Sequence, residues 1–315
     1  MWYRIGLIVV AAVGVCALPA GAAKKEKLVV GFSQVGAESA WRTAETESIR
    51  NEAAKRGVEL KFADAQGKQE NQVQALRSFI AQHVDAIILA PKVETGWESV
   101  LKDARRAKIP VILVDRGINV SDNMLYTTLI ASDFVAEGRM AGEWLAKKMD
   151  GKGNIVELQG TPGAAPAIDR QKGFAEIIAK FPDMKIIKSQ TGDFNRAKGK
   201  ETMEAFIKAD GKNINALYAH NDDMALGAIQ AIEEAGMKPG TDITIVSIDG
   251  VKGAFEAMVD GKLNCTVECN PLLGPAAFDA VEAALDGKAL EKKTIVKDSI
   301  FDQSQAAGVI GSRQY

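Results

Sequence analysis

The sequence repeats one unit, an apolar strand followed by a helical segment, along most of its length. Apolar runs begin at residues 28, 59, 86 and 111 and again at 154, 186, 215 and 244, a spacing of 25 to 32 residues within each series. Strands that are apolar almost throughout, alternating with helices of ten or more residues, are typical of parallel sheets covered on both faces. The sequence therefore predicts an α/β fold with two doubly wound, Rossmann-like lobes, and a single large sheet is the alternative.

The same pattern gives expected bounds for each element. In the first half the strands are expected at 27–34, 59–64, 86–90, 111–115 and 126–130, with helices at 41–56, 71–82 and 95–107. In the second half the strands are expected at 154–159, 185–191, 216–219, 244–249 and 263–268, with helices at 133–149, 169–180, 195–209, 222–235 and 253–260. No Pro/Ser-rich stretch separates the two series, so we expect short crossings between the lobes and no floppy linker.

Residues 1–23 have the composition of a secretory signal peptide. Arg4 precedes an apolar run at 5–18, and small residues fill 20–23, where cleavage is expected. The apolar run is short for a membrane anchor, which needs about 20 residues. A lipoprotein attached through Cys16 is the weaker alternative, because the bulky Val15 precedes that cysteine. We therefore expect a soluble chain exported to the periplasm.

The composition excludes several classes of protein. Thirty-nine basic residues against 41 acidic ones leave a net charge of −2, which disfavours nucleic acid as a partner. Two histidines and three cysteines leave little for a metal cluster, and Cys265 and Cys269, about 13 Å apart along a strand, are expected as buried free thiols. Neither G-x-x-x-x-G-K-[ST] nor G-x-G-x-x-G follows a strand, so we expect no metal and no cofactor.

Polar side chains gather where the predicted strands end. Ligands of open α/β sheets bind outside the carboxyl ends of the strands. These ends carry planar donors, paired acceptors and an amide: Arg42, Arg116 and Arg170; Glu38, Asp115 and Asp249; and Asn221. Each sugar hydroxyl donates one hydrogen bond and accepts two, so this set suits a ligand rich in hydroxyls. The rings of Trp41 and Phe194 could cover the apolar faces of a sugar.

Simpler roles compete with ligand binding at some of these positions. A lone aspartate after a strand is often a helix cap or turn former, the role expected for Asp64, Asp133 and Asp222. His220 is expected to be a hydrogen-bonded neighbour of the site and not a base. Facing carboxylates could also hydrolyse a glycoside. Three nearby arginines would keep those carboxylates ionised, however, and therefore poor general acids. Binding is favoured over catalysis, and we expect no enzyme.

Six segments carry a resemblance to a known family. They are KLVVGFSQVGAESAWR, ILVDR, VELQGTPGAAPAIDRQKGF, SQTGDFNRAKGKE, LYAHNDDMALGAIQA and SIDG. They resemble the ribose-binding branch of the periplasmic sugar-binding proteins of ABC transporters, the type I periplasmic binding proteins, and within it the galactofuranose-binding subgroup. The resemblance implies two lobes, joined by a three-crossing hinge, that close over one sugar. It places the first lobe at 24–129 plus 270–298 and the second at 130–269 plus 299–315.

The resemblance also implies which residues touch the sugar. From the first lobe these are Glu38, Ser39, Trp41, Arg42, Asp115 and Arg116; from the second, Arg170, Phe194, Asn221, Asp249 and Glu268. Glutamine often occupies the last crossing in this family, where the present chain has Cys269 between Glu268 and Asn270. Ribose binders also place aromatic residues in the first loop, where this chain has Glu38 and Trp41, which makes ribose the less favoured ligand.

The function implied is that of a sugar-transport component. A protein of this kind binds a monosaccharide, with galactofuranose as the first choice, and delivers it to the permease subunits of an ABC transporter as a monomer. Ribose, galactose or another pentose or hexose is the alternative ligand, and presentation to a chemoreceptor is a possible second role. A transcriptional repressor's effector domain shares the lobe pair but would need an N-terminal helix-turn-helix, where this chain has an export segment. A glycoside-acting enzyme is the distant alternative.

Overall fold

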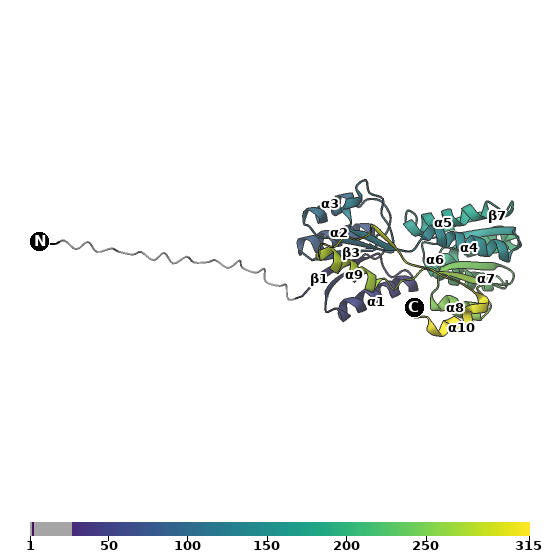
Figure 1. The fold of residues 1–315 in the computed structure, drawn as a ribbon. Coiled ribbons are helices and arrows are strands. Elements are labelled where there is room, and N and C mark those ends of the chain that lie inside the picture. The colour runs from purple at the N-terminus through teal and green to yellow at the C-terminus, as the bar shows by residue number, and fades with distance from the viewer. Residues whose placement is uncertain (1, 3–26) are drawn as a thin grey trace.

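The computed structural model describes residue 2 and residues 27–315, so the predicted signal peptide lies, apart from Trp2, outside the described residues. Two α/β lobes lie next to each other, each built on its own six-stranded sheet (Figure 1). The single large sheet considered from the sequence is therefore wrong, and the two-lobe α/β fold is confirmed. Within the described part of the chain, no helix is long and apolar enough to cross a membrane.

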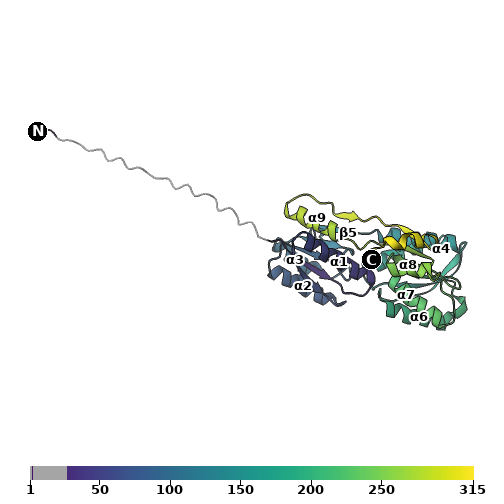
Figure 2. The ribbon, with the colours of Figure 1, turned by 90° about the horizontal axis from the view of Figure 1, so that it is seen from below.

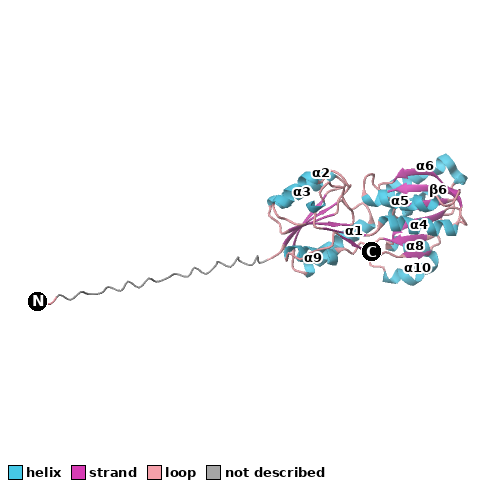
Figure 3. Cartoon of the chain, turned by 45° about the horizontal axis from the view of Figure 1, so that its top comes forward, coloured by secondary structure: helices cyan, strands magenta, loops and turns pink. Residues whose placement is uncertain are grey.

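The first lobe holds an entirely parallel sheet in the order β11-β5-β4-β3-β1-β2. Its strands are β1 (Val29–Gln34), β2 (Glu59–Asp64), β3 (Ala86–Leu89), β4 (Val111–Val114), β5 (Thr128–Ala131) and β11 (Lys293–Ile295). Its helices are α1 (Ala40–Lys55), α2 (Gln69–Ala81), α3 (Glu98–Arg106) and α9 (Gly274–Leu285), with a short turn η1 (Asn123–Leu125). Helices α1 and α9 pack together on one face of the sheet, and α2 and α3 pack together on the other (Figure 3).

The second lobe repeats this design with the order β12-β10-β9-β8-β6-β7. Its strands are β6 (Lys152–Gln159), β7 (Asp183–Thr191), β8 (Ala216–Ala219), β9 (Thr244–Asp249), β10 (Cys265–Glu268) and β12 (Ile300–Asp302), the last antiparallel to β10. Its helices are α4 (Phe134–Lys148), α5 (Ala165–Ile178), α6 (Arg196–Asp210), α7 (Asp222–Glu234), α8 (Lys252–Val259) and α10 (Gln303–Val309), with short turns η2 (Gly211–Asn213) and η3 (Ile310–Ser312).

The polypeptide crosses between the lobes three times. The first crossing lies between β5 and α4, the second between β10 and α9, and the third between β11 and β12. The third crossing is visible in Figure 2 as the segment that runs from the first lobe, past α9, to the second lobe. The boundary expected at 129/130 falls inside β5, whose last residue, Ala131, still pairs within the first sheet. The lobe change therefore comes two residues later, where the buried strand ends.

The strands and helices expected up to residue 268 are present, with shifted ends. The largest shift is in α5, which begins at Ala165 and not at 169, because Pro166 in its first turn suits a helix start. Strands β11 and β12 were not expected from the sequence. Each has only three residues, none of them buried, so no apolar run marks them.

Two glycines bring helices α4 and α5 into backbone contact. A Cβ atom added to Gly138 of α4 would lie 2.3 Å from the carbonyl oxygen of Arg170, and one added to Gly173 of α5 would lie 2.1 Å from the carbonyl oxygen of Val135. Such distances leave room only for hydrogen at both positions. The two helices are thereby held at one fixed separation, which matters because each contributes a charged residue near the cleft.

Candidate functional site

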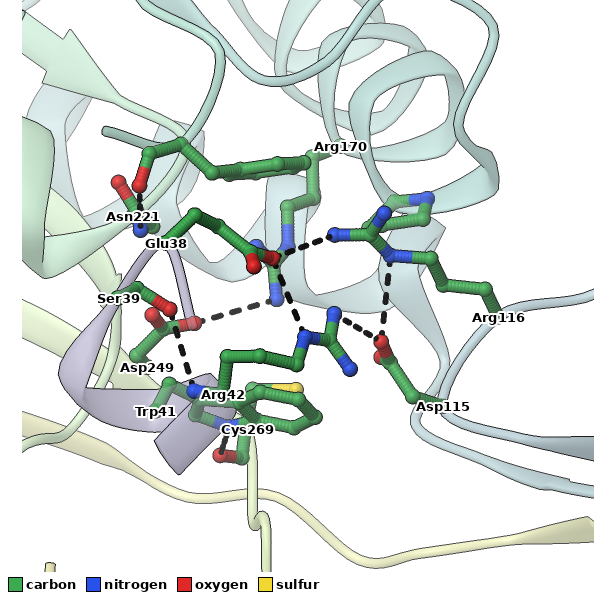
Figure 4. A pocket seen from close by; sticks show the side chains of 12 residues that line it. Glu38, Ser39, Trp41, Arg42, Asp115, Arg116, Arg170, Asn221, Asp249 and Cys269 are labelled. Carbon is green, nitrogen blue, oxygen red and sulfur yellow. Dashed lines mark hydrogen bonds and ion pairs between the residues drawn. The ribbon is translucent and has the colours of Figure 1, made fainter. Parts of the chain in front are cut away.

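A pocket lies between the lobes. Figure 4 shows side chains from both lobes converging on it. The residues that line it are Glu38, Ser39, Trp41, Arg42, Asp115, Arg116, Pro166, Arg170, Phe194, Asn221, Asp249 and Cys269. Ten of the eleven residues predicted from the sequence are among them, and Glu268 is not.

The first lobe contributes a compact group of charges centred on Arg42. Ser39 caps the N-terminus of α1, its hydroxyl accepting a hydrogen bond from the Arg42 amide, so Arg42 lies in the first turn. The Arg42 guanidinium is buried and pairs with Asp115 (Nη2 to Oδ2, 2.7 Å) and Glu38 (Nε to Oε1, 3.2 Å). Its Nη1 pairs with Glu45, one helical turn on and fully buried. Three carboxylates therefore surround one arginine.

Arg116 completes this group from the end of β4. Its Nε lies 3.2 Å from Oδ2 of Asp115, its Nη2 lies 3.6 Å from Oε1 of Glu38, and its Nη1 donates to the carbonyl of Lys92 at 3.2 Å. Burial, together with the neighbouring charge of Arg42, lowers the pKa of Arg116. Asp115 has a φ of +62°, a left-handed conformation that costs a non-glycine residue about 1–3 kcal/mol.

The second lobe contributes Arg170, from α5. Its Nε pairs with Glu137 of α4 at 2.7 Å, its Nη1 donates to the carbonyl of His220 at 2.6 Å, and its Nη2 lies 3.6 Å from Oδ1 of Asp249. Burial opposes the charge of Arg170, but the carboxylate of Glu137 holds its pKa above the ordinary value. The guanidinium is fixed by one carboxylate and one carbonyl before any ligand is considered.

Asp249 differs from the expectation that nearby arginines keep every carboxylate ionised. It is buried, and burial raises its pKa well above the ordinary value in spite of the lowering by Arg170 at 3.6 Å. Its φ of +131° places it in backbone space that L-residues rarely adopt. The cost of desolvation exceeds the attraction of an arginine that is shared with Glu137 and too far for a direct hydrogen bond.

Two aromatic rings and one amide complete the pocket. The Trp41 indole donates to the carbonyl of Cys269, 2.5 Å away, and so connects α1 to the second crossing. Phe194 has a φ of +57°, and its ring covers Gly160, where an added Cβ would lie 1.9 Å from Cζ. The Asn221 side chain caps α7 through the Met224 amide and donates to the carbonyl of Phe194 at 3.2 Å. These bonds fix the ring and the amide in their orientations.

Glu268 lies outside the pocket because a tertiary contact occupies it. Its Oε1 accepts from Arg313 at 2.7 Å and from the Tyr315 hydroxyl at 3.0 Å. The two lining residues that the predicted set lacks are Pro166 and Cys269. Cys269 directly follows a predicted strand and lies in the second crossing, not the last, so its position could have indicated it. Nothing in the sequence pattern singles out Pro166.

The simpler roles expected for Asp64 and Asp133 are present, but the helix-capping role expected for Asp222 is not. Asp133 caps α4 through the Ala136 amide, and Asp64 accepts from the Gln66 amide in a turn. Asp222 is buried and accepts from Ser247, Thr266 and the Val251 amide, so its role is structural although Asn221, and not Asp222, caps α7.

The thiols and the histidine also have the expected places. His220 lies 3.1 Å from Glu157 and accepts from the Gly160 amide, as a hydrogen-bonded neighbour. Cys265 and Cys269 are both free and buried.

Comparison with known proteins identifies the family. Residues 30–289 match the model of the periplasmic binding protein domain. The chain belongs to the periplasmic binding protein family. Galactofuranose-binding protein YtfQ of Escherichia coli (strain K12) is 56% identical over 305 residues, which cover 96% of this chain and 95% of that protein.

Two solved structures share the arrangement of the lobes. The binding protein of an arabinose ABC transporter from Shewanella sp. ANA-3, bound to α- and β-L-arabinofuranose, has 58% identity and a TM-score of 0.89 over 91% of this chain and 95% of its own. A Mycobacterium smegmatis protein in complex with β-D-fucofuranose has 52% identity and a TM-score of 0.89 over the same shares of the two chains.

Proposed function

We propose that this chain is the sugar-binding component of an ABC importer, and that it holds one furanose monosaccharide, with galactofuranose as the first candidate, in the pocket between its lobes. The observation that carries the proposal is the convergence of three buried arginines, three carboxyl groups and two aromatic rings on one pocket between the lobes. Alternating donors and acceptors suit hydroxyl groups, each of which needs both. Buried Oε2 of Glu38 has no hydrogen-bond partner among the described residues and is available to a ligand hydroxyl.

The choice of a furanose rests on the relatives. Proteins named or crystallised for galactofuranose, arabinofuranose and fucofuranose share 52–58% of their residues with this chain. The ribose import binding protein RbsB of Bacillus subtilis (strain 168) shares 32%. Ribose, galactose or another pentose or hexose is therefore the alternative ligand. We propose that the residues lining the pocket contact the sugar. They are ten of the eleven residues predicted from the sequence, all but Glu268, together with Cys269 and Pro166.

The mechanism follows from the division of the pocket between two lobes. We propose lobes of residues 27–131 plus the segment from α9 through β11, and of residues 134–268 plus β12 and the residues that follow it. Two hydrogen bonds already join them near the pocket: Ala40 N to Oδ2 of Asp223 (2.8 Å) and Glu94 N to the carbonyl of Gly163 (3.0 Å). A ligand that contacts both lobes favours the closed form over the open one, and the closed form is the state presented to the permease.

Export to the periplasm and a monomeric state complete the proposal. The export segment at 1–23 and the family membership support the periplasmic location. A glycoside-acting enzyme is the competing class, because Asp249 has a raised pKa and could serve as an acid. Incubation of the protein with the bound sugar, followed by recovery of the sugar, separates the two: a binding protein returns it unaltered.

The decisive test is a thermal-shift screen of monosaccharides with D-galactose, L-arabinose, D-fucose, D-ribose and D-fructose. A ligand at 100 times its Kd stabilises the native state by about 2.7 kcal/mol, so the sugar bound best gives the largest rise in Tm. Arg116→Ala and Arg170→Ala should abolish that rise, because truncation of a buried charged hydrogen-bond partner costs ~2–5 kcal/mol. Arg139→Ala, on the exposed face of α4 and paired with Glu176, is the matched control. A rise in Tm that both pocket variants retain would refute the site.

A further inference from the structure

The three crossings are joined by a cluster of buried polar groups. Ser132, from the first crossing, donates a hydrogen bond to Oδ1 of Asp298, from the third, at 2.9 Å. The thiol of Cys269, from the second, lies 3.6 Å from the Ser132 hydroxyl. Each crossing therefore supplies one residue to the same cluster. Ser132 and Cys269 are buried, and Asp298 is half-buried.

Glu137 connects this cluster to the pocket. It lies in the first turn of α4, directly after the first crossing, and is fully buried. Its Oε2 accepts from Nε of Arg170 at 2.7 Å, while its Oε1 has no hydrogen-bond partner among the described residues. Helix α4 packs against β10, the strand that leads into Cys269. The Cys269 thiol lowers the pKa of Glu137, and the charge of Glu137 raises the pKa of Asp298. Glu137 itself does not line the pocket.

We propose that Glu137 is a positioning residue: it holds the Arg170 guanidinium toward the ligand and links it to Ser132, Cys269 and Asp298, so that sugar contact and lobe closure depend on one buried cluster. The inference rests on the proposed sugar-binding function. Opening the lobes requires the crossings to move relative to one another, and any such movement shifts the partners of Glu137. Arg170 stays paired with Glu137 within the second lobe, whereas the surroundings of Glu137 at the crossings differ between the open and the closed arrangement.

The charges in this cluster make closure sensitive to protons. Arg170 is the cation that acts on both Glu137 and Asp298, and Cys269, Asp249 and Asp115 are titratable groups that interact with members of this cluster. Burial, together with the charge of Glu137, raises the pKa of Asp298 to about 8, from an ordinary value of 3.8. In an open form that admits water to this carboxyl, its pKa falls back toward the ordinary value. Closure below pH 8 then takes up a proton, so sugar affinity strengthens as the pH falls below 8.

The test measures the affinity for L-arabinose and D-galactose by calorimetry in the full mature chain. Glu137→Gln should weaken binding about tenfold to a hundredfold, because a hydrogen bond to a charged group is lost or reduced. Glu137→Asp keeps the charge and should recover part of this loss. Glu143→Gln, the same substitution on the exposed face of the same helix, is the matched control and should bind as the wild type does. A folded Glu137→Gln variant with wild-type affinity overturns the proposal.

The pH profile gives a second readout that a purely structural role would not move. The wild-type affinity should rise by up to tenfold per pH unit as the pH falls below about 8, and Asp298→Asn, which cannot take up the proton, should show a smaller slope. Equal slopes in the two proteins overturn the proposal even where Glu137→Gln fails to fold. Failure of the proposed function looks different, since no sugar would then raise the Tm of the wild type.

Discussion

The two halves of the pocket hold their charged groups in different ways. In the first lobe, Glu38, Arg42 and Glu45 follow one another at the start of α1, and Arg42 also pairs with Asp115 at the end of β4. In the second lobe, Arg170, Phe194, Asn221 and Asp249 come from four separate segments. Arg170 is anchored to Glu137 and to the carbonyl of His220, two residues that do not line the pocket.

This difference predicts different dependence on the hinge. The ion pairs of Arg42 with Glu38, Glu45 and Asp115 lie within the first lobe, so they are present whether the lobes are open or closed. The pair of Arg170 with Glu137 lies within the second lobe as well, but Glu137 also adjoins Cys269 and Asp298 of the crossings. The first half is therefore preorganised for the ligand, and the second half completes the site on closure.

The largest effect expected is the loss of either central arginine. Both Arg42→Ala and Arg170→Ala should abolish sugar binding. Arg42→Ala should lower the free energy of unfolding of the ligand-free protein by ~3–5 kcal/mol, the cost of removing one partner of a buried ion pair, and Arg170→Ala should lower it by less. Arg42 neutralises three carboxylates, two of them fully or almost fully buried, whereas Arg170 makes its one close ion pair with Glu137. Chemical denaturation of the two variants measures the difference. Equal or reversed losses would show that the first half is not the more self-contained one.

The sequence predicts the lining residues better than it predicts what holds them. Carboxyl ends of parallel strands meet at one sheet edge, so the positions after the strands lead to Arg116, Asn221 and Asp249. The same reasoning does not predict the roles of Glu45 and Glu137, because a glutamate within a helical pattern is normally expected on the solvent-exposed face of the helix. Their roles depend on how α1 and α4 are buried, which only the tertiary structure determines.

Glu268 and Asp249 show two further limits of the sequence pattern. Glu268 follows a strand as the binding residues do, yet its partner, Arg313, lies 45 residues away in sequence and takes it out of the pocket. The pKa of Asp249 is likewise raised by burial at the pocket between the lobes, which the composition of the sequence does not predict. Position along a strand thus predicts where a side chain goes only when no distant partner competes for it.

The two aspartates of the pocket provide the next comparison. Asp115→Asn should weaken sugar binding at neutral pH by ~2–5 kcal/mol, because Arg42 and Arg116 lose the charge that they share. Asp249→Asn should cost only about 1 kcal/mol, since an amide resembles the protonated carboxyl that burial of Asp249 favours.

Calorimetry at two pH values checks both aspartate variants. The raised pKa of Asp249 means that its charge is gained only as the pH rises, so the difference between wild type and Asp249→Asn should grow with rising pH. A large loss in Asp249→Asn that does not change with pH would mean that the second half of the pocket binds its ligand through an ionised carboxylate, as the first half does.

The smallest effect expected comes from a residue that supports the second half from outside the pocket. Arg313 donates to the carbonyl of Gly250 at 2.6 Å and to Glu268 at 2.7 Å, and its guanidinium lies 5.0 Å from the ring centre of Phe255. These contacts hold the loop of Asp249, whose φ of +131° is costly to maintain. Arg313→Ala should therefore weaken sugar binding about threefold to tenfold, an effect of ~1 kcal/mol.

Arg56→Ala is the matched control, because Arg56 makes ion pairs with Asp279 and Glu282 on the surface of the first lobe, away from the pocket. Isothermal titration of the two variants, with thermal unfolding of the ligand-free proteins beside it, separates an effect on the loop from a general loss of stability. If Arg313→Ala binds as the wild type does, the strained Asp249 loop is held by its own lobe, as Asp115 is. The second half of the pocket would then be as self-supporting as the first.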